Sequence, residues 1–317
     1  MVYFATMLKN FPFNILFDNE TDKFSGPEEI YDKILEYPLN IIYNTSHECN
    51  LHCQYCFRRG SGLPPQTNKE IMSDMKNLPV NKPLRLVLSG GEPFWRDNIY
   101  EVFDFCSKQP WEIIVVSNGT YPINWGKVPQ NIMFEFSIDA PNADIYGKTR
   151  GGSPKQYKTL VKNVVDAVDQ GHRVRPCYLM ARINTTKKIL EQIIDFSKSL
   201  GVYELRLQRF KPWGGGEALA KNYEFSQNEY IDICNRAVKY AKRIGIGIRV
   251  PQNNRFLAIG SVYVLPNGNV TIQYADKKEQ MVLGNLREKS LIDIWKPHQK
   301  RFSKIHLQSL IRPKRIL

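Results

Sequence analysis

The 317-residue sequence contains no run of roughly 18 apolar residues, no low-complexity tract and no repeat beyond an alternation of strand-like and helix-like segments. The missing apolar run predicts that no helix spans a membrane. The first nine residues lack the basic region and long apolar segment of a secretory signal, which indicates a cytoplasmic protein. Cysteine is scarce, with six residues. Without a secretion signal, metal binding is a better explanation for clustered cysteines than a disulfide framework.

An excess of one sign of charge is present but is not concentrated. The chain has 44 Lys and Arg against 31 Asp and Glu, which gives a net charge of +13. These residues are spread along the chain, and the main cluster lies in residues 296–315. A generally basic, solvated surface explains this distribution better than a nucleic-acid footprint does, so nucleic acid is the less favoured partner.

Short apolar runs alternate with amphipathic helical patterns through most of the chain. Six strand–helix units favour a parallel sheet, and right-handed crossovers predict that it curls into a barrel. We therefore expect an α/β fold, a partial (β/α)6 barrel of the TIM type, with a doubly wound open sheet as the alternative. The expected strands are residues 39–43, 84–88, 112–116, 132–136, 173–181 and 204–208, and the clearest helices are 98–107, 157–168, 188–200 and 227–244.

The two ends of the chain have a different character. Residues 261–273 read as a hairpin around the Asn267–Gly268 turn, followed by a strand at 282–286 and a short helix at 291–295. The expected organisation is a lead-in over residues 1–37, with a helix at 27–35, a core barrel over 38–250 and a small α+β extension over 251–317.

Three of the six cysteines fall within eight residues. Cys49, Cys53 and Cys56 have the spacing C-x3-C-x2-C. Three thiolates on a four-iron cluster leave one iron open to a small molecule, which is the arrangement of a chemically active cluster. Zinc is the alternative metal, with His47 or His52 as a fourth ligand.

Unusual residues follow the next three predicted strands. The sequence Ser-Gly-Gly-Glu-Pro begins at Ser89, Ser117 and Asn118 end the following strand, and Ser137 and Asp139 the one after. The carboxyl ends of parallel barrel strands form the functional face. Two adjacent glycines allow a ligand to approach the backbone closely, although Gly-Gly is also ordinary in a turn. We therefore expect these residues and the cysteine loop to form one site.

The combination resembles the radical S-adenosylmethionine superfamily. It is carried by the cysteine triplet with Tyr55 before its last member, by residues 89–93, and by residues 117–119 and 137–139. The resemblance implies one [4Fe-4S] cluster on the three cysteines and S-adenosylmethionine on the open iron, cleaved reductively to a 5′-deoxyadenosyl radical that abstracts a substrate hydrogen. The resemblance also implies cofactor contacts at Ser89, Gly90, Gly91, Glu92, Ser117, Asn118, Ser137, Asp139, Arg182 and Tyr55.

The last part of the chain resembles the SPASM or twitch extension of the peptide-modifying branch. The resemblance rests on residues 264–270, 283–286 and 291–295. No cysteine follows Cys234, and Gln273 stands where an auxiliary-cluster ligand is expected. The implied enzyme has one cluster, an external electron donor such as ferredoxin or flavodoxin, and a peptide or small-metabolite substrate. A radical enzyme that modifies RNA, or a non-catalytic metal protein on the same scaffold, are the alternatives. Neither the substrate nor the catalytic residues that contact it are identified by the sequence.

Overall fold

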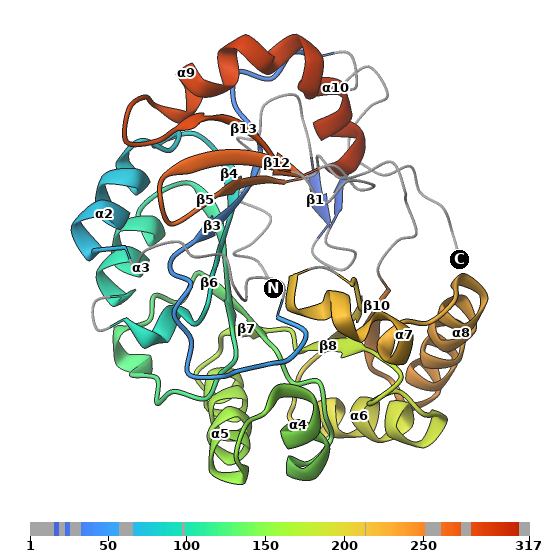
Figure 1. The fold of residues 1–317 in the computed structure, drawn as a ribbon. Helices are drawn as coiled ribbons and strands as arrows, with labels where there is room; N and C mark the ends of the chain where they lie inside the picture. Colours follow the sequence, from blue (N-terminus) through green and yellow to red (C-terminus); the bar gives the residue numbers. More distant parts are fainter. Residues whose placement is uncertain are drawn as a thin grey trace.

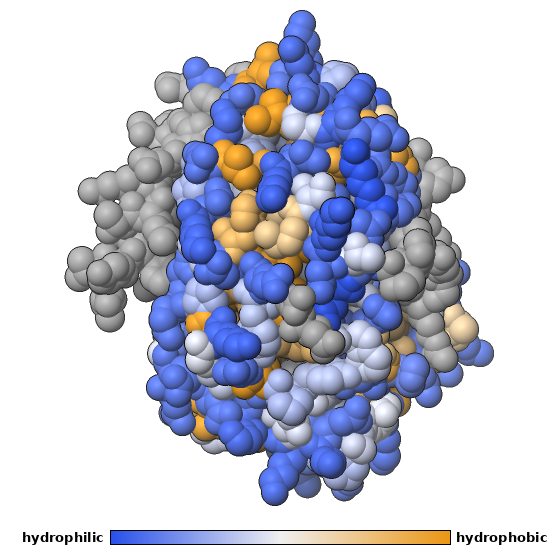
Figure 2. Space-filling view, turned by 90° about the vertical axis from the view of Figure 1, so that its left-hand side faces the viewer, coloured by the Kyte–Doolittle hydropathy of each residue, from blue (hydrophilic) through white to orange (hydrophobic). Residues whose placement is uncertain are grey.

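The computed structural model describes residues 16–18, 23–25, 33–56, 66–96, 99–212, 214–250, 261–273 and 280–310. Within these residues a strongly curved sheet is lined on its outer side by helices (Figure 1). None of the described helices is long and apolar enough to cross a membrane. The face of the molecule that carries α2 (Asn68–Lys76) and α3 (Ile99–Ser107) is largely hydrophilic, with apolar side chains in separate patches (Figure 2).

The barrel wall consists of parallel strands in chain order. An eight-stranded sheet has the order β13-β12-β11-β3-β4-β5-β6-β7, and a three-stranded sheet has the order β10-β9-β8. A bridge between Ser137 and Cys177 joins the two sheets beyond β6. This arrangement confirms the expected partial barrel. The strands of the wall are β3 (Asn40–Asn44), β4 (Leu84–Ser89), β5 (Trp111–Ser117), β6 (Ile132–Phe136), β7 (Arg173–Val174), β8 (Cys177–Met180), β9 (Glu204–Arg209) and β10 (Gly247–Arg249).

Alternation along each strand separates an apolar outer face from a more polar inner face. In β4, Leu84, Leu86 and Leu88 are fully buried among the helices, while Arg85 and Ser89 lie on the opposite side. The helices that supply the outer layer are α2 (Asn68–Lys76), α3 (Ile99–Ser107), α4 (Ala143–Arg150), α5 (Pro154–Asp169), α6 (Lys187–Ser199), α7 (Ala220–Tyr223) and α8 (Gln227–Ile244). Short 3-10 turns are η4 (Pro93–Trp95), η5 (Trp125–Lys127) and η6 (Gly214–Leu219).

The fifth predicted strand is interrupted, and this corrects the expectation of one strand over residues 173–181. It forms β7 and β8 with a break at Arg175 and Pro176. Proline has no N–H to donate to a neighbouring strand, which disfavours an unbroken central strand at that point. The two pieces stay in the wall because the Arg175 N–H donates to the Phe134 carbonyl (2.8 Å) and the Arg206 N–H to the Pro176 carbonyl (2.8 Å).

The C-terminal extension continues the barrel wall. β11 (Val262–Val264) pairs in parallel with β3 and antiparallel with β12 (Asn269–Gln273), and β13 (Gln280–Asn285) completes the sheet. Gly268 takes a φ of 82° in the hairpin turn, as the Asn-Gly sequence predicts. The segment ends with α9 (Leu291–Trp295), the turn η8 (Lys296–His298) and α10 (Gln299–Leu310).

Side chains of the extension hold the segment that leads into β3. Ser303 Oγ accepts the Leu35 N–H (2.8 Å), His306 Nε2 accepts the Leu39 N–H (2.9 Å), and Trp295 Nε1 donates to the Leu35 carbonyl (3.0 Å). Earlier in the chain, β1 (Leu16–Asp18) pairs with β2 (Lys23–Ser25). The predicted helix at 27–35 lies mostly outside the described residues, and residues 33–35 are not helical.

Candidate functional site

The cysteine loop leaves the carboxyl end of β3 and lies at the carboxyl edge of the sheet. The Thr45 N–H donates to the Ser89 carbonyl (2.7 Å), so the loop begins against the end of β4. The Cys56 N–H donates to the Cys53 carbonyl (3.1 Å) and gives the triplet a compact turn. All three thiols are free. The sequence therefore places three thiols on one short loop at the predicted functional face.

Two glycines after β4 allow the next loop to lock onto the cysteine loop. The Gly91 N–H donates to the Ser46 carbonyl (2.6 Å), and the Glu92 N–H donates to the Glu48 carbonyl (2.8 Å). A Cβ on Gly91 would lie 1.8 Å from the Glu48 carbonyl oxygen. Gly90 has a φ of 143°, and its Cβ would lie 2.5 Å from the Ser46 carbonyl oxygen. Glycine at both positions is thus required by contact between the two loops, before any ligand is considered.

Glu92 is fully buried and connects the ends of β4 and β5. Its carboxylate accepts hydrogen bonds from Ser117 Oγ (2.8 Å), the Asn118 N–H (2.6 Å) and the Phe94 N–H (3.1 Å). Burial raises the pKa of Glu92 to about 7, although these three donors act in the opposite direction. The carboxylate therefore fixes the position of residues 117 and 118.

Asn118 extends this arrangement to a cysteine. Its Nδ2 lies 3.5 Å from Cys49 Sγ and donates to Asn50 Oδ1 (2.9 Å), while its Oδ1 accepts from Thr120 Oγ1 (2.6 Å). Asn50 Nδ2 in turn donates to Thr120 Oγ1 (2.7 Å). The sequence did not point to Asn50 or Thr120, because only the fold brings the ends of β3 and β5 together. The only signal in the sequence was that both are polar residues directly adjacent to residues of the predicted motifs.

Asp139 joins the other side of the cysteine loop to the barrel. This residue is 1% exposed and has a φ of 50°. Its carboxylate accepts from Tyr55 Oη (2.6 Å), Arg150 Nε (2.7 Å) and the Leu179 N–H (2.6 Å). Asp139 thus orders the loop between Cys53 and Cys56 through Tyr55. The sequence did not predict the contact of Arg150 with Asp139, because only the turn after β6 brings the two residues together.

Burial and charge have opposing effects on the cysteine thiols. Burial raises the pKa of Cys53 to about 11 and also raises that of Cys49. The Arg150 guanidinium lowers the pKa of Cys53, but by less than burial raises it. Burial therefore favours the neutral thiol at Cys49 and Cys53, and a bound cation or cluster would favour the thiolate.

Ser137 and Arg182 occupy different surroundings. The Ser137 N–H donates to the Ser117 carbonyl (2.9 Å), which places Ser137 beside the other strand ends. Arg182 donates from Nη2 to Glu229 (2.6 Å) and from Nε to the Glu224 carbonyl (2.8 Å). Its guanidinium thus lies at the start of α8, and contact with a cofactor carboxylate would require these bonds to be exchanged.

The donor set fits a cluster better than a single ion. Among the described residues, no group of three or more His, Cys, Asp or Glu side chains is arranged to hold one metal ion. Thiolates at separate corners of a cubane need not converge on one point, whereas zinc ligands must. Cys49 also has two N–H groups near its sulfur, from Leu51 and Asn118, both at 3.5 Å. Hydrogen bonds of this kind are typical tuning contacts of cluster thiolates.

Comparison with protein families agrees with this chemistry. Residues 43–180 match the family model of the radical SAM superfamily, and residues 256–315 match the SPASM model, an iron–sulfur cluster-binding domain. The first match contains the whole cysteine loop and the strand-end residues through Asp139. The expected cofactor types, an iron–sulfur cluster and S-adenosylmethionine, are thereby confirmed.

Similar proteins include a bacteriocin biosynthesis protein, a maturase and a protein solved with a bound precursor peptide. The subtilosin biosynthesis protein AlbA of Bacillus subtilis is 27% identical over 41% of this chain and 31% of its own length. The mycofactocin maturase MftC of Mycolicibacterium smegmatis is 22% identical over 59% of this chain and 48% of its own length. Streptococcus suis SuiB bound to the precursor peptide SuiA shares the fold, with a TM-score of 0.68, 15% identity, and coverage of 83% of this chain and 65% of SuiB. The chain spans about a third to a half of the length of these two curated relatives.

Proposed function

We propose that this chain is a radical S-adenosylmethionine enzyme that modifies a peptide. The observation that carries the proposal is the interlock of the cysteine loop with the Gly-Gly-Glu turn, through the backbone bonds of Gly91 and Glu92. Cys49, Cys53 and Cys56 would hold the cluster, which when bound and reduced would supply the electron for cleavage of S-adenosylmethionine and so for abstraction of a substrate hydrogen. The matching family model and the peptide-modifying relatives support this activity.

The chain's own residues have distinct tasks in this scheme. Cys49, Cys53 and Cys56 are the proposed cluster ligands. Glu92 and Asp139 hold the loops around the cluster in place from opposite sides, because each accepts three hydrogen bonds across different elements. Such fixed positioning is what a protein contributes when the cofactor carries the difficult chemistry.

We propose the contacts to S-adenosylmethionine from the family resemblance. The proposed contact residues form two groups in the structure. Ser89, Gly90, Gly91, Glu92, Ser117 and Asn118 lie together at the ends of β4 and β5. Tyr55, Ser137 and Asp139 lie around the end of β6. We assign the methionine part of S-adenosylmethionine to the first group and its ribose and adenine to the second, with Arg182 as a further carboxylate contact.

We further propose that the extension binds no cluster of its own. Residues 256–315 match an iron–sulfur domain, yet this segment contains no cysteine. Buried apolar side chains occupy its interior instead, among them Leu286, Ile294 and Trp295. The electrons for turnover would then come to the single cluster from an external one-electron donor such as ferredoxin or flavodoxin.

Anaerobic reconstitution with iron and sulfide tests the proposed function. The reduced protein is incubated with S-adenosylmethionine, and 5′-deoxyadenosine is measured by liquid chromatography. We expect this product from the wild-type chain and none from Cys53→Ala. Cys106→Ala is the matched control, because Cys106 is buried on α3 against Met75 and far in sequence from the loop. A wild-type protein with the cluster's absorption spectrum but no 5′-deoxyadenosine would contradict the proposal.

A further inference from the structure

The inner face of β9 carries polar side chains toward the barrel interior. Glu204, Arg206 and Gln208 alternate with the buried Leu205 and Leu207, which pack outward. The parallel pairing of β9 with β8 sets Arg206 opposite Cys177 and Gln208 opposite Leu179. Gln208 is exposed and Arg206 is half-buried, although both lie in the middle of the wall.

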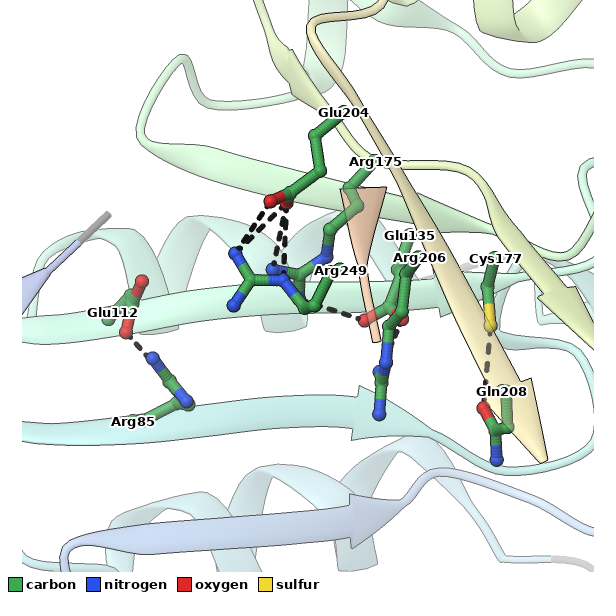
Figure 3. A network of polar contacts seen from close by, with 9 residues as sticks. All are labelled: Arg85, Glu112, Glu135, Arg175, Cys177, Glu204, Arg206, Gln208 and Arg249. Carbon is green, nitrogen blue, oxygen red and sulfur yellow. Dashed lines mark hydrogen bonds and ion pairs between the residues drawn. The ribbon is translucent and has the colours of Figure 1, made fainter. Parts of the chain in front are cut away.

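A network of charged residues contacts the Arg206 guanidinium (Figure 3). Arg206 Nη1 donates to Glu135 Oε1, and Arg175 Nη2 donates to Glu135 Oε2 (3.2 Å). Glu135 is 3% exposed, and the two arginines lower its pKa to about 2 against the effect of burial. The Glu135 carboxylate is therefore permanently charged and holds Arg206 in one orientation.

Further arginine–glutamate pairs surround the Arg206–Glu135 contact. Figure 3 shows Arg175, Arg206 and Arg249 linked to Glu135 and Glu204 by the pairs Arg175–Glu135, Arg206–Glu135, Arg175–Glu204 and Arg249–Glu204, with the separate pair Arg85–Glu112 beside them. Arg173 adds a further positive charge close to Glu204. The inner wall around Arg206 is therefore lined by arginine and glutamate side chains that are held in ion pairs.

Arg206 is the member of the network that faces the open part of the interior. Its side chain is 36% exposed, whereas those of Glu135 and Arg175 are 3% and 2% exposed. Within the described residues its hydrogen-bond and ion-pair partner is Glu135, which it contacts through Nη1. Two residues further along the same face, the Gln208 side chain accepts from Cys177 Sγ (3.4 Å) through its Oε1. Arg206 Nε and Nη2 and Gln208 Nε2 are therefore N–H donors that remain available to a molecule in the barrel.

We infer that Arg206 and Gln208 bind a carboxylate of the substrate inside the barrel. The inference rests on the proposed function and narrows its substrate to a peptide that presents an acidic side chain or a terminal carboxylate. A guanidinium offers two parallel N–H groups to a carboxylate, and the Gln208 amide supplies a third donor. The site lies on the inner wall below the strand ends that surround the cluster, so a carboxylate held there anchors the substrate beneath the reacting cofactor.

Chemical protection of Arg206 tests this assignment in the reconstituted wild-type protein. Phenylglyoxal modifies accessible arginines, and peptide mass spectrometry reports each one separately. Glutarate is the carboxylate probe, and its neutral diamide, glutaramide, is the control of similar shape. We expect glutarate at about ten times its Kd to slow the modification of Arg206 roughly tenfold. Glutaramide should not slow it, and neither compound should affect Arg236, an exposed arginine paired with Asp232 on α8.

Two further measurements ask whether the bound carboxylate belongs to the substrate or to the cofactor, and whether the Gln208 amide contributes to binding. S-adenosylmethionine also carries a carboxylate, so protection of Arg206 by S-adenosylmethionine, with loss of the glutarate effect, would assign the site to the cofactor and overturn the inference. In Gln208→Leu the protection by glutarate should weaken several-fold. In the wild-type protein, equal labelling of Arg206 with and without glutarate would also overturn the inference. Labelling needs no turnover, so this result is independent of whether 5′-deoxyadenosine forms.

Discussion

Two regions of this chain match iron–sulfur families, and they differ in what fills them. The cysteine loop and its neighbours, within residues 43–180, contain three free thiols and buried carboxylates that order the loops around them. The extension, within residues 256–315, contains no cysteine, and apolar side chains such as Leu286, Ile294 and Trp295 are buried in its described part. Apolar packing thus dominates the described core of the extension, whereas hydrogen bonds from buried carboxylates order the cysteine loop.

The largest expected effect is the loss of the cluster when a cysteine of the loop is replaced. In Cys53→Ala the cluster should be lost, because two thiolates remain where the cubane needs three protein ligands. Iron, sulfide and visible absorption per chain would report the loss, while the far-ultraviolet circular dichroism stays that of the wild type. A variant that keeps a full cluster would place the ligands elsewhere in the chain.

A substitution in the extension should lower the stability of the fold and leave the cluster content unchanged. Trp295 is fully buried, and Trp295→Ala should lower the free energy of unfolding by about 3–5 kcal/mol. Urea titration followed by circular dichroism measures this change. The iron content per folded chain should remain that of the wild type. Loss of iron from the folded fraction would show that the extension takes part in holding the cluster.

The buried carboxylate of Glu92 makes stability depend on pH. Its pKa is about 7 in the folded chain and 4.5 for a free glutamate, so the folded state holds this proton more tightly. Its contribution is destabilising above pH 7, and the penalty is relieved as pH falls through 7 toward 4.5. Glu92→Gln should flatten the pH dependence across this window by up to about 3 kcal/mol. Chemical denaturation of both proteins at several pH values measures the difference, and identical pH profiles would contradict the assignment.

The smallest expected effect is on stability, and it concerns the contact between the extension and the segment that leads into β3. Ser303→Ala removes the acceptor of the buried Leu35 N–H and should cost about 1 kcal/mol. Ser290→Ala, which removes the cap of α9, is a matched control that leaves this contact intact. Thermal unfolding compares the two variants. Cluster content that falls with Ser303→Ala and stays constant with Ser290→Ala would reveal coupling between the two regions.

The sequence predicted the parts of the fold that local patterns encode. The bounds of β6, α8 and α9 agree with the expected ranges, because strong alternation or helical periodicity ends at clear turn and cap residues. The break at Pro176 was missed because the apolar run continues past it. Helices α2 and α4 were also missed, since α4 is only eight residues long and weakly patterned.

The site was predictable only in part. The cysteines, Glu92 and Asp139 could be chosen because each follows a strand in a recognisable motif. The arrangement of Asn50 with Thr120, of Arg150 with Asp139, and of Arg206 with Glu135 depends on strands that are far apart in sequence. An inward-facing arginine in a strand looks like an exposed residue of an amphipathic sheet until the curvature of the wall is known.

Mössbauer spectroscopy of the 57Fe-reconstituted protein, with and without S-adenosylmethionine, tests the central claim most directly. If the cysteine loop holds the only cluster and leaves one iron open, S-adenosylmethionine should alter the signal of about one quarter of the iron. A change in about one eighth of the iron would reveal a second cluster. No change at all would contradict the account, because it would mean that no iron is open to the cofactor.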